Sequence, residues 1–67
     1  MQMTDILQAI TLREKEVLYF LSKGMTYKEI SEKMEVSPET VKMHLKNIYR
    51  KLKVQNKIEA LTKVKLL

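Results

Sequence analysis

The chain has 67 residues, of which 45% are hydrophobic and 31% charged, and its net charge is +5. A chain of this length closes one small hydrophobic core, and the absence of cysteine excludes disulfide staples and thiolate zinc sites. No apolar run reaches the ~20 residues that cross a bilayer and the N-terminus lacks the basic start of a signal peptide, so we expect a cytoplasmic protein with no membrane partner.

The first predicted helix covers about residues 12–22 and follows a lead-in or linker over residues 1–9. Thr11 and Glu14 have the spacing of a capping box, in which each side chain accepts a hydrogen bond from the other residue's backbone amide. Gly24 can adopt the left-handed conformation that ends a helix. We therefore place one folded domain over residues 10–67.

Two further helices, over about residues 27–34 and 38–52, are separated by a short turn. Thr26 and Glu29 repeat the capping-box spacing before the first of them. Ser37 and Pro38 begin the second, because serine caps free amides and proline fits the first helical position. A short helix, a tight turn and a longer helix make a helix-turn-helix motif, whose second helix can lie in the DNA major groove.

A fourth helix is predicted over about residues 57–66, with Asn56 as its N-cap and Glu59 three residues later. The chain has one glycine and one proline, and β-branched residues never alternate with polar ones over the length of a strand. The predicted fold class is therefore all-α, with four helices.

The helix over about 38–52 has two faces of different character. At about 100° per residue, its apolar side chains fall within about 60° of one another and are expected to pack on the other helices; they are Val41, Leu45, Ile48 and Leu52. The opposite side is long, basic and polar. It carries Glu39, Met43, Lys46 and Arg50, flanked by Lys42, Lys53 and Asn47.

The basic face supplies the candidate DNA contacts. Helix-turn-helix proteins touch base edges with the N-terminal half of this helix, so Lys42, Met43 and Lys46 are the candidate base readers. Lysine can donate to guanine, and a methionine thioether can lie against a thymine methyl group. Phosphate contacts are expected at the two helix N-termini and farther along the basic face; the residues are Thr26, Tyr27, Lys28, Ser37, Thr40 and Arg50.

His44 is the single histidine and lies at the edge of the apolar stripe. It is expected to be partly buried and hydrogen-bonded, because it lacks partners for a metal site and a nucleophile for catalysis. The five methionines are assigned to the start, to packing or to contacts. We predict no metal, no cofactor and no enzymatic activity.

The combined pattern resembles a LuxR-type (also called GerE-type) domain. The resemblance begins with ITLREKEVL at residues 10–18 and GMTYKEI at residues 24–30. It continues without a gap through Val36-Ser37, Thr40-Val41-Lys42, His44, Asn47-Ile48, Lys51-Leu52, Val54 and Glu59-Ala60. It covers about residues 10–64. Two positions depart from the family pattern: Lys57 stands where arginine is usual, and Tyr27 where asparagine is commoner.

The resemblance implies a four-helix bacterial transcription regulator domain whose third helix reads double-stranded DNA. By position, Lys42, Met43 and Lys46 match the places where family members touch bases. The resemblance also implies dimerisation through the fourth helix, for which Ile58 and Leu61 are the candidate contacts, while extra core packing or fraying explains the same residues. RNA polymerase is a further candidate partner. Because such domains usually follow a sensor, we expect a C-terminal output domain rather than a free-standing regulator.

Two other interpretations stay open on the sequence. A promoter-binding domain like the fourth region of sigma factors shares a similar run through Thr40-Val41-Lys42, although His44, Asn47-Ile48 and Glu59-Ala60 favour the LuxR type. A basic helical module could instead bind an acidic protein. Duplex binding that falls with salt and depends on sequence would identify a DNA reader.

Overall fold

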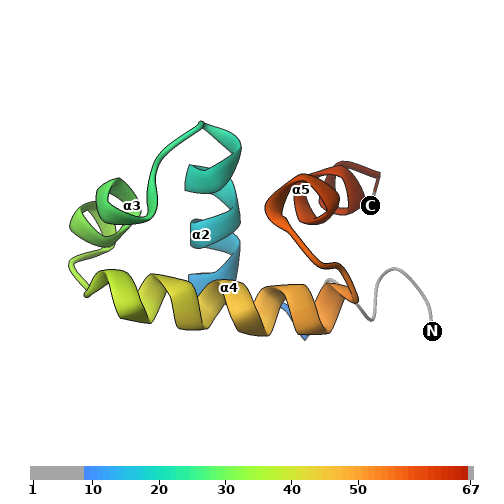
Figure 1. Ribbon diagram of the computed structural model, residues 1–67, viewed down its shortest axis with the longest axis horizontal. Coiled ribbons are helices and arrows are strands. Elements are labelled where there is room, and N and C mark those ends of the chain that lie inside the picture. The colour runs from blue at the N-terminus through green and yellow to red at the C-terminus, as the bar shows by residue number, and fades with distance from the viewer. Residues whose placement is uncertain (1–8, 67) are drawn as a thin grey trace.

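The computed structural model describes residues 9–66, and within them it contains four helices (Figure 1). They are α2 (Leu12–Ser22), α3 (Tyr27–Met34), α4 (Pro38–Leu52) and α5 (Lys57–Leu66). The four predicted helices and the all-α class are therefore confirmed. None of the described helices combines the length and apolarity of a membrane span. Residues 1–8 and Leu67 lie outside the described part, so the lead-in over 1–9 and the domain bounds 10–67 stay predictions.

The predicted capping boxes open α2 and α3. At α2, the Glu14 amide donates to Thr11 Oγ1 at 3.1 Å and the Thr11 amide donates to Glu14 Oε1 at 2.9 Å. At α3, the same two bonds join Thr26 and Glu29 at 3.2 and 2.9 Å. Each box satisfies two backbone amides, which is why these helices begin where they do.

The start of α5 differs from a capping box in one bond. The Glu59 amide donates to Asn56 Oδ1 at 2.9 Å, as predicted for an asparagine N-cap. The Glu59 carboxylate accepts from the Gln55 amide at 2.8 Å, one residue before the expected donor. The carboxylate thereby fastens the connection from α4 as well as the helix start.

A residue with positive φ follows three of the described helices, directly after α3 and α4 and two residues after the end of α2. Gly24 has φ 81°, as predicted, while Glu35 and Lys53 hold φ values of 57° and 58° despite having a Cβ. Each of these ends is closed by an amide that reaches back five residues; the bonds run from Met25 to Phe20, Val36 to Ser31 and Val54 to Tyr49. These closures turn the chain sharply after α2, α3 and α4.

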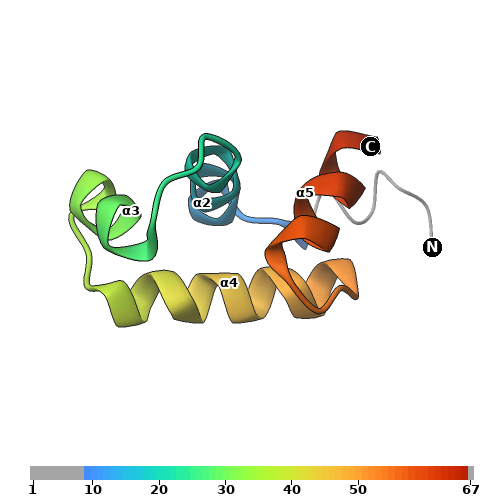
Figure 2. The same ribbon diagram turned by 45° about the horizontal axis from the view of Figure 1, so that its top comes forward.

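The core lies between α4 and the three other helices. In Figures 1 and 2, α4 runs along one side of the molecule, and α2, α3 and α5 all pack against it from the other side. Its four predicted stripe residues are all buried. The rest of the buried apolar set is Ile10, Val17, Leu18, Leu21, Ile30, Met34 and Ala60. At ~25 cal/mol per Å² of apolar surface, this burial is the main stabilising term available to the domain.

Two lysines tie the ends of helices together. Lys51 Nζ on α4 lies 2.7 Å from Glu14 Oε1 on α2, and the Glu14 side chain is only 4% exposed. Lys63 Nζ on α5 donates to the Leu52 carbonyl at 2.7 Å, which satisfies a backbone acceptor at the C-terminal end of α4. Both contacts hold α4 against its neighbours at its C-terminal end.

Candidate nucleic-acid interface

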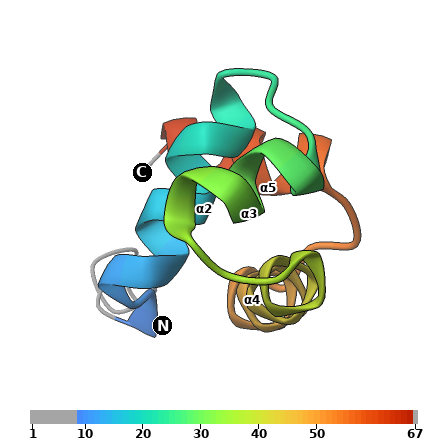
Figure 3. The ribbon, with the colours of Figure 1, turned by 90° about the vertical axis from the view of Figure 1, so that its left-hand side faces the viewer.

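The helix-turn-helix motif consists of α3, the turn over 35–37 and α4. Ile30 and Met34 bury the inner side of α3 against the core. The turn is closed by the Val36 amide, which donates to the Ser31 carbonyl at 3.0 Å. Viewed nearly along α4, the other helices all lie on one side of it (Figure 3). The opposite side of α4 is therefore left open.

That open side, the outer face of α4, carries the predicted base readers. Lys42 and Lys46 are exposed and the Met43 side chain is 62% exposed. Within residues 9–66 neither lysine forms an ion pair. The predicted division of α4 into a buried stripe and an exposed basic face is thus confirmed, while contact of these three side chains with DNA stays a prediction.

Arg50 lies at the far end of the outer face. It is exposed, and its guanidinium makes a long hydrogen bond of 3.4 Å to Asn47 Oδ1, one turn earlier. At ~1.5 Å of rise per residue, Arg50 stands about 20 Å from Ser37 along the helix. The distance along the helix axis from Ser37 to Arg50 therefore exceeds the ~12 Å width of the major groove.

The predicted phosphate anchors at the N-terminus of α4 are two hydroxyls that face each other. Ser37 Oγ accepts from the Thr40 amide at 3.2 Å and lies 3.0 Å from Thr40 Oγ1. One hydroxyl proton is used between them, which leaves the other available to an acceptor. At α3, the Thr26 oxygen accepts from the Glu29 amide, and its own proton remains free to donate.

Tyr27 and Lys28 occupy the first turn of α3. Both are exposed, with 38% of the Tyr27 residue surface accessible. Tyr27 lies beside the half-buried Tyr49 of α4, and burial, followed by the neighbouring Tyr27, raises the pKa of Tyr49. This tyrosine pair joins the start of α3 to the C-terminal half of α4.

The sequence interpretation missed the role of Lys51, which stands among the basic residues of α4 but points to the core side. Burial acts to raise the pKa of Glu14, but hydrogen bonds from Lys51 and from the Thr11 amide outweigh it and hold the pKa below its ordinary value of 4.5. A separation of 37 residues gives no local spacing signal. One signal was available in the sequence: Glu14, a capping-box residue, lies on the same side of its helix as the buried residues Val17, Leu18 and Leu21.

His44 and the two candidate dimer residues also have defined surroundings. His44 is half-buried, as predicted. The prediction that it is hydrogen-bonded was wrong for the described residues, because its ring makes no hydrogen bond within residues 9–66. Ile58 is 71% exposed on α5, whereas Leu61 is half-buried and packs against the core cluster. Ala60 is fully buried. Ile58 thus presents more free apolar surface than Leu61.

Comparison with known proteins adds independent findings. The family model described as "Bacterial regulatory proteins, luxR family" matches residues 8–64. The chain is 51% identical over 51 residues to the transcriptional activator protein CarR of Pectobacterium carotovorum subsp. carotovorum, which covers 76% of this chain and 21% of CarR. It is 38% identical over 65 residues to the HTH-type transcriptional regulator AlkS of Alcanivorax borkumensis, which covers 97% of this chain and 8% of AlkS.

A solved structure is similar in fold as well as in sequence. The crystal structure of the response regulator ChrA, from a heme-sensing two-component system, matches with a TM-score of 0.83 at 38% identity. The match covers 87% of this chain and 29% of ChrA. The chain therefore spans less than a third of the length of each of these three relatives.

Proposed function

The chain belongs to the luxR family of bacterial regulatory proteins, whose helix-turn-helix domain binds DNA to regulate transcription, and from this premise we propose how its own residues engage a duplex. In this docking α4 lies in the major groove with its outer face toward the bases. The observation that carries the proposal is the open basic side of α4, directly opposite its fully buried stripe.

Base reading is assigned to Lys42, Met43 and Lys46. All three lie in the N-terminal two-thirds of α4 and are exposed. An ammonium group can donate to guanine O6 and N7, and the Met43 thioether can contact a thymine methyl group. Since neither lysine has to leave an ion pair within the described residues, both charges are available to DNA.

Phosphate contacts are assigned to the N-termini of α3 and α4 and to the C-terminal part of α4. Thr26, Tyr27 and Lys28 surround the N-terminus of α3, and Ser37 and Thr40 surround that of α4. Helix N-termini favour anions, and hydroxyls, amides and a lysine supply the donors. Arg50 is assigned to a phosphate beyond the far end of the read bases, because it lies about 20 Å from Ser37 along the helix axis.

A dimer on DNA is the proposed assembly. Two recognition helices one turn of DNA apart, ~34–36 Å, would read a two-fold symmetric site. Ile58 is the candidate central contact on α5, since 71% of its surface is exposed, and Leu61 is the second candidate. A single exposed isoleucine offers little apolar surface for an interface, so the dimer is expected to form mainly on DNA.

The whole regulator is proposed to be larger than this domain. The chain spans 8% of AlkS and 21% of CarR, which supports a role as the output domain of a longer, cytoplasmic regulator. RNA polymerase is retained as a partner of that regulator. No residue of the domain is assigned to a cofactor, to a metal or to catalysis.

The proposal is tested by selecting duplexes from a random pool and titrating a selected and a scrambled duplex by fluorescence anisotropy. We expect at least about tenfold preference for the selected duplex. The logarithm of the affinity should fall with the logarithm of salt with a slope of about −2 per domain, because Lys28 and Arg50 each neutralise one phosphate. Equal binding of both duplexes would favour a basic protein-interaction module instead.

A further inference from the structure

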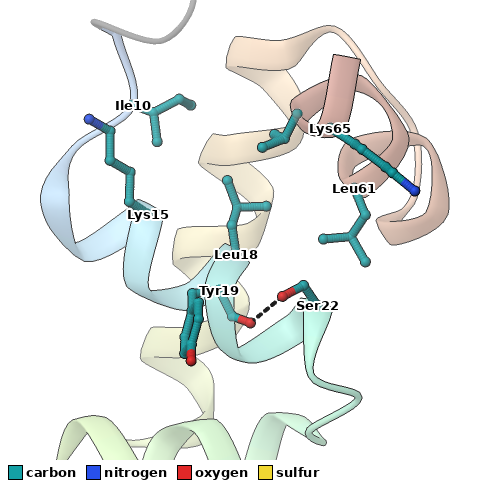
Figure 4. Close-up of a pocket in the computed structure, with 8 residues that line it drawn as sticks. Ile10, Lys15, Leu18, Tyr19, Ser22, Leu61 and Lys65 are labelled. Atoms are coloured by element: carbon teal, nitrogen blue, oxygen red, sulfur yellow. Dashed lines mark hydrogen bonds between the residues drawn. The ribbon is translucent and has the colours of Figure 1, made fainter. Parts of the chain in front are cut away.

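An open groove of about 650 Å³ lies between α2 and α5. Its floor and walls are apolar, formed by Ile10, Leu18, Leu61 and Val64. Figure 4 shows Leu18 of α2 and Leu61 of α5 pointing into the space between the two helices. Ile10 and Leu18 belong to the buried core, whereas Leu61 and Val64 are half-buried, so part of the apolar lining is open to a partner.

The groove lies apart from the proposed DNA interface. Both helices that line it pack on the same side of α4 (Figure 2). The candidate base readers are instead exposed on the outer face of α4. None of the eight described residues that line the groove has been assigned a base or phosphate contact, and among them Leu61 alone is also a candidate dimer contact. A partner in the groove would therefore leave the outer face of α4 accessible.

The rim of the groove is positively charged. Lys15 of α2 and Lys65 of α5 stand on opposite sides of it (Figure 4). Both lysines are exposed, and none of the described lining residues is acidic. An apolar strip between two cationic edges is complementary to an apolar stripe between two rows of carboxylates.

The polar groups of the groove argue against a small-molecule pocket. Such pockets hold a few fixed polar groups that converge on the ligand. Here the Ser22 hydroxyl already donates to the Tyr19 carbonyl at 2.6 Å. The remaining polar groups are the Tyr19 hydroxyl, on a residue that is 58% exposed, and the two lysine ammonium groups on long flexible stems. Charges along the edges of an open apolar groove are instead the pattern of helix-in-groove recognition.

We propose that the α2–α5 groove is a docking site for an amphipathic helix of a partner protein, with leucine-like side chains along its apolar stripe and glutamate or aspartate on both flanks. The apolar side chains of that helix pack against Leu18, Leu61 and Val64. Its carboxylates pair with Lys15 and Lys65. The groove is thus a second binding surface, on the opposite side of the domain from the proposed DNA interface.

The test uses a designed peptide of about 18 residues, with leucines at helical positions i, i+3, i+4 and i+7 and glutamates on both flanks. The peptide is titrated into the ¹⁵N-labelled chain, and binding is mapped by NMR chemical shifts. We expect the shifts to gather at Leu18, Leu61 and Val64. Because DNA is absent, the outcome does not depend on the proposed DNA docking.

Charge reversal then tests the rim. Lys15→Glu combined with Lys65→Glu should lower the affinity for the glutamate peptide about tenfold or more, and a lysine-flanked version of the peptide should recover it. Arg13→Glu combined with Lys33→Glu changes the net charge equally at exposed positions that do not line the groove. This matched control should stay within about twofold of the parent chain.

Three results would overturn the proposal. The first is peptide shifts on the outer face of α4, which would mean that acidic peptides bind the basic DNA face. The second is no binding up to about 1 mM, the weak end of specific recognition. The third is a concentration-dependent dimer of the chain alone whose shifts map to the groove, measured by sedimentation and NMR, because a second copy would then be the occupant.

Discussion

The inner and outer faces of α4, a helix of 15 residues, have opposite characters. The inner stripe, from Val41 to Leu52, is buried against three other helices and determines whether the domain folds. The outer face, with Lys42, Met43 and Lys46, is exposed. Substitutions on the two faces should therefore have different effects. Those on the inner face should change stability, and those on the outer face should change DNA affinity.

Val41→Asp is expected to have the largest effect. Val41 is fully buried, so the new carboxylate would be placed in the core without a partner. The cost of more than about 4 kcal/mol is comparable with the whole stability of a domain of this size. We expect the cooperative thermal transition, followed by circular dichroism, to be lost.

The neighbouring substitution Lys42→Asp is the matched control for Val41→Asp. It introduces the same side chain one residue along, on the outer face, and should keep the cooperative transition while weakening DNA binding. If the Val41→Asp domain instead melts within a few degrees of the parent, the assignment of the inner face is wrong.

Lys46→Ala tests the outer face. Removing one base contact should weaken binding to the selected duplex by about 1–3 kcal/mol, with the melting temperature little changed. Anisotropy titration at one fixed salt concentration measures the loss. Lys33→Ala, at an exposed position of α3, is the control with the same charge change. Equal affinity of the Lys46→Ala and parent chains for the selected duplex would contradict the docking of α4.

Glu14→Gln tests the ion pair between Glu14 of α2 and Lys51, the α4 lysine that points to the core side. The substitution leaves Lys51 opposite a neutral amide, and we expect the free energy of unfolding at pH 7 to fall by about 1–2 kcal/mol. This is below the penalty for a fully buried pair, because the Lys51 side chain is 26% exposed. Denaturant unfolding measures it, with exposed Glu16→Gln as the control on the same helix.

The pH dependence of the Glu14→Gln effect has a definite sign. The folded-state pKa of Glu14 is lowered, so its carboxylate stabilises the fold above the ordinary value of 4.5, and this stabilisation is lost as the pH falls through the lower folded-state pKa. The gap between parent and variant should therefore shrink below pH 4.5. A gap that stays constant to pH 3 would mean that the carboxylate charge contributes nothing.

Local chemistry explains which parts of this fold were predictable. The helix starts follow from Thr11, Thr26 and Ser37, because a cap needs only partners within four residues. The face of α4 follows from the period of its apolar residues. The pairing of Glu14 with Lys51 depends on how two helices pack, 37 residues apart, and has no local pattern.

The candidate site divides in the same way. The exposure of Lys42, Met43 and Lys46 was predictable, since it is the complement of a buried stripe on a regular helix. The groove between α2 and α5 was not, because it depends on how far Leu61 stands from Leu18 across two helices. The left-handed residue after α2 was predictable because it is a glycine, Gly24. The left-handed Glu35 and Lys53 were not, because these residue types rarely adopt a positive φ and so give no local signal.

Lys53→Gly has the smallest expected effect and tests where the outer face ends. Lys53 holds φ 58°, a conformation that glycine adopts without steric cost. The substitution should raise stability by about 0.5–1 kcal/mol, measured by thermal melting, whereas Lys42→Gly inside α4 should lower it by about the same amount. A variant no more stable than its parent would mean that the turn carries no strain.

The same variant reports on DNA through its lost charge. If Lys53 touches a phosphate, the salt slope of DNA binding should become less steep by about one while stability rises. An unchanged slope would mean that the DNA-contacting face stops at Arg50, the last exposed cation inside α4. In both cases stability is expected to rise, but the salt slope becomes less steep only if Lys53 touches a phosphate. One substitution therefore distinguishes a backbone role for this position from a role in the interface.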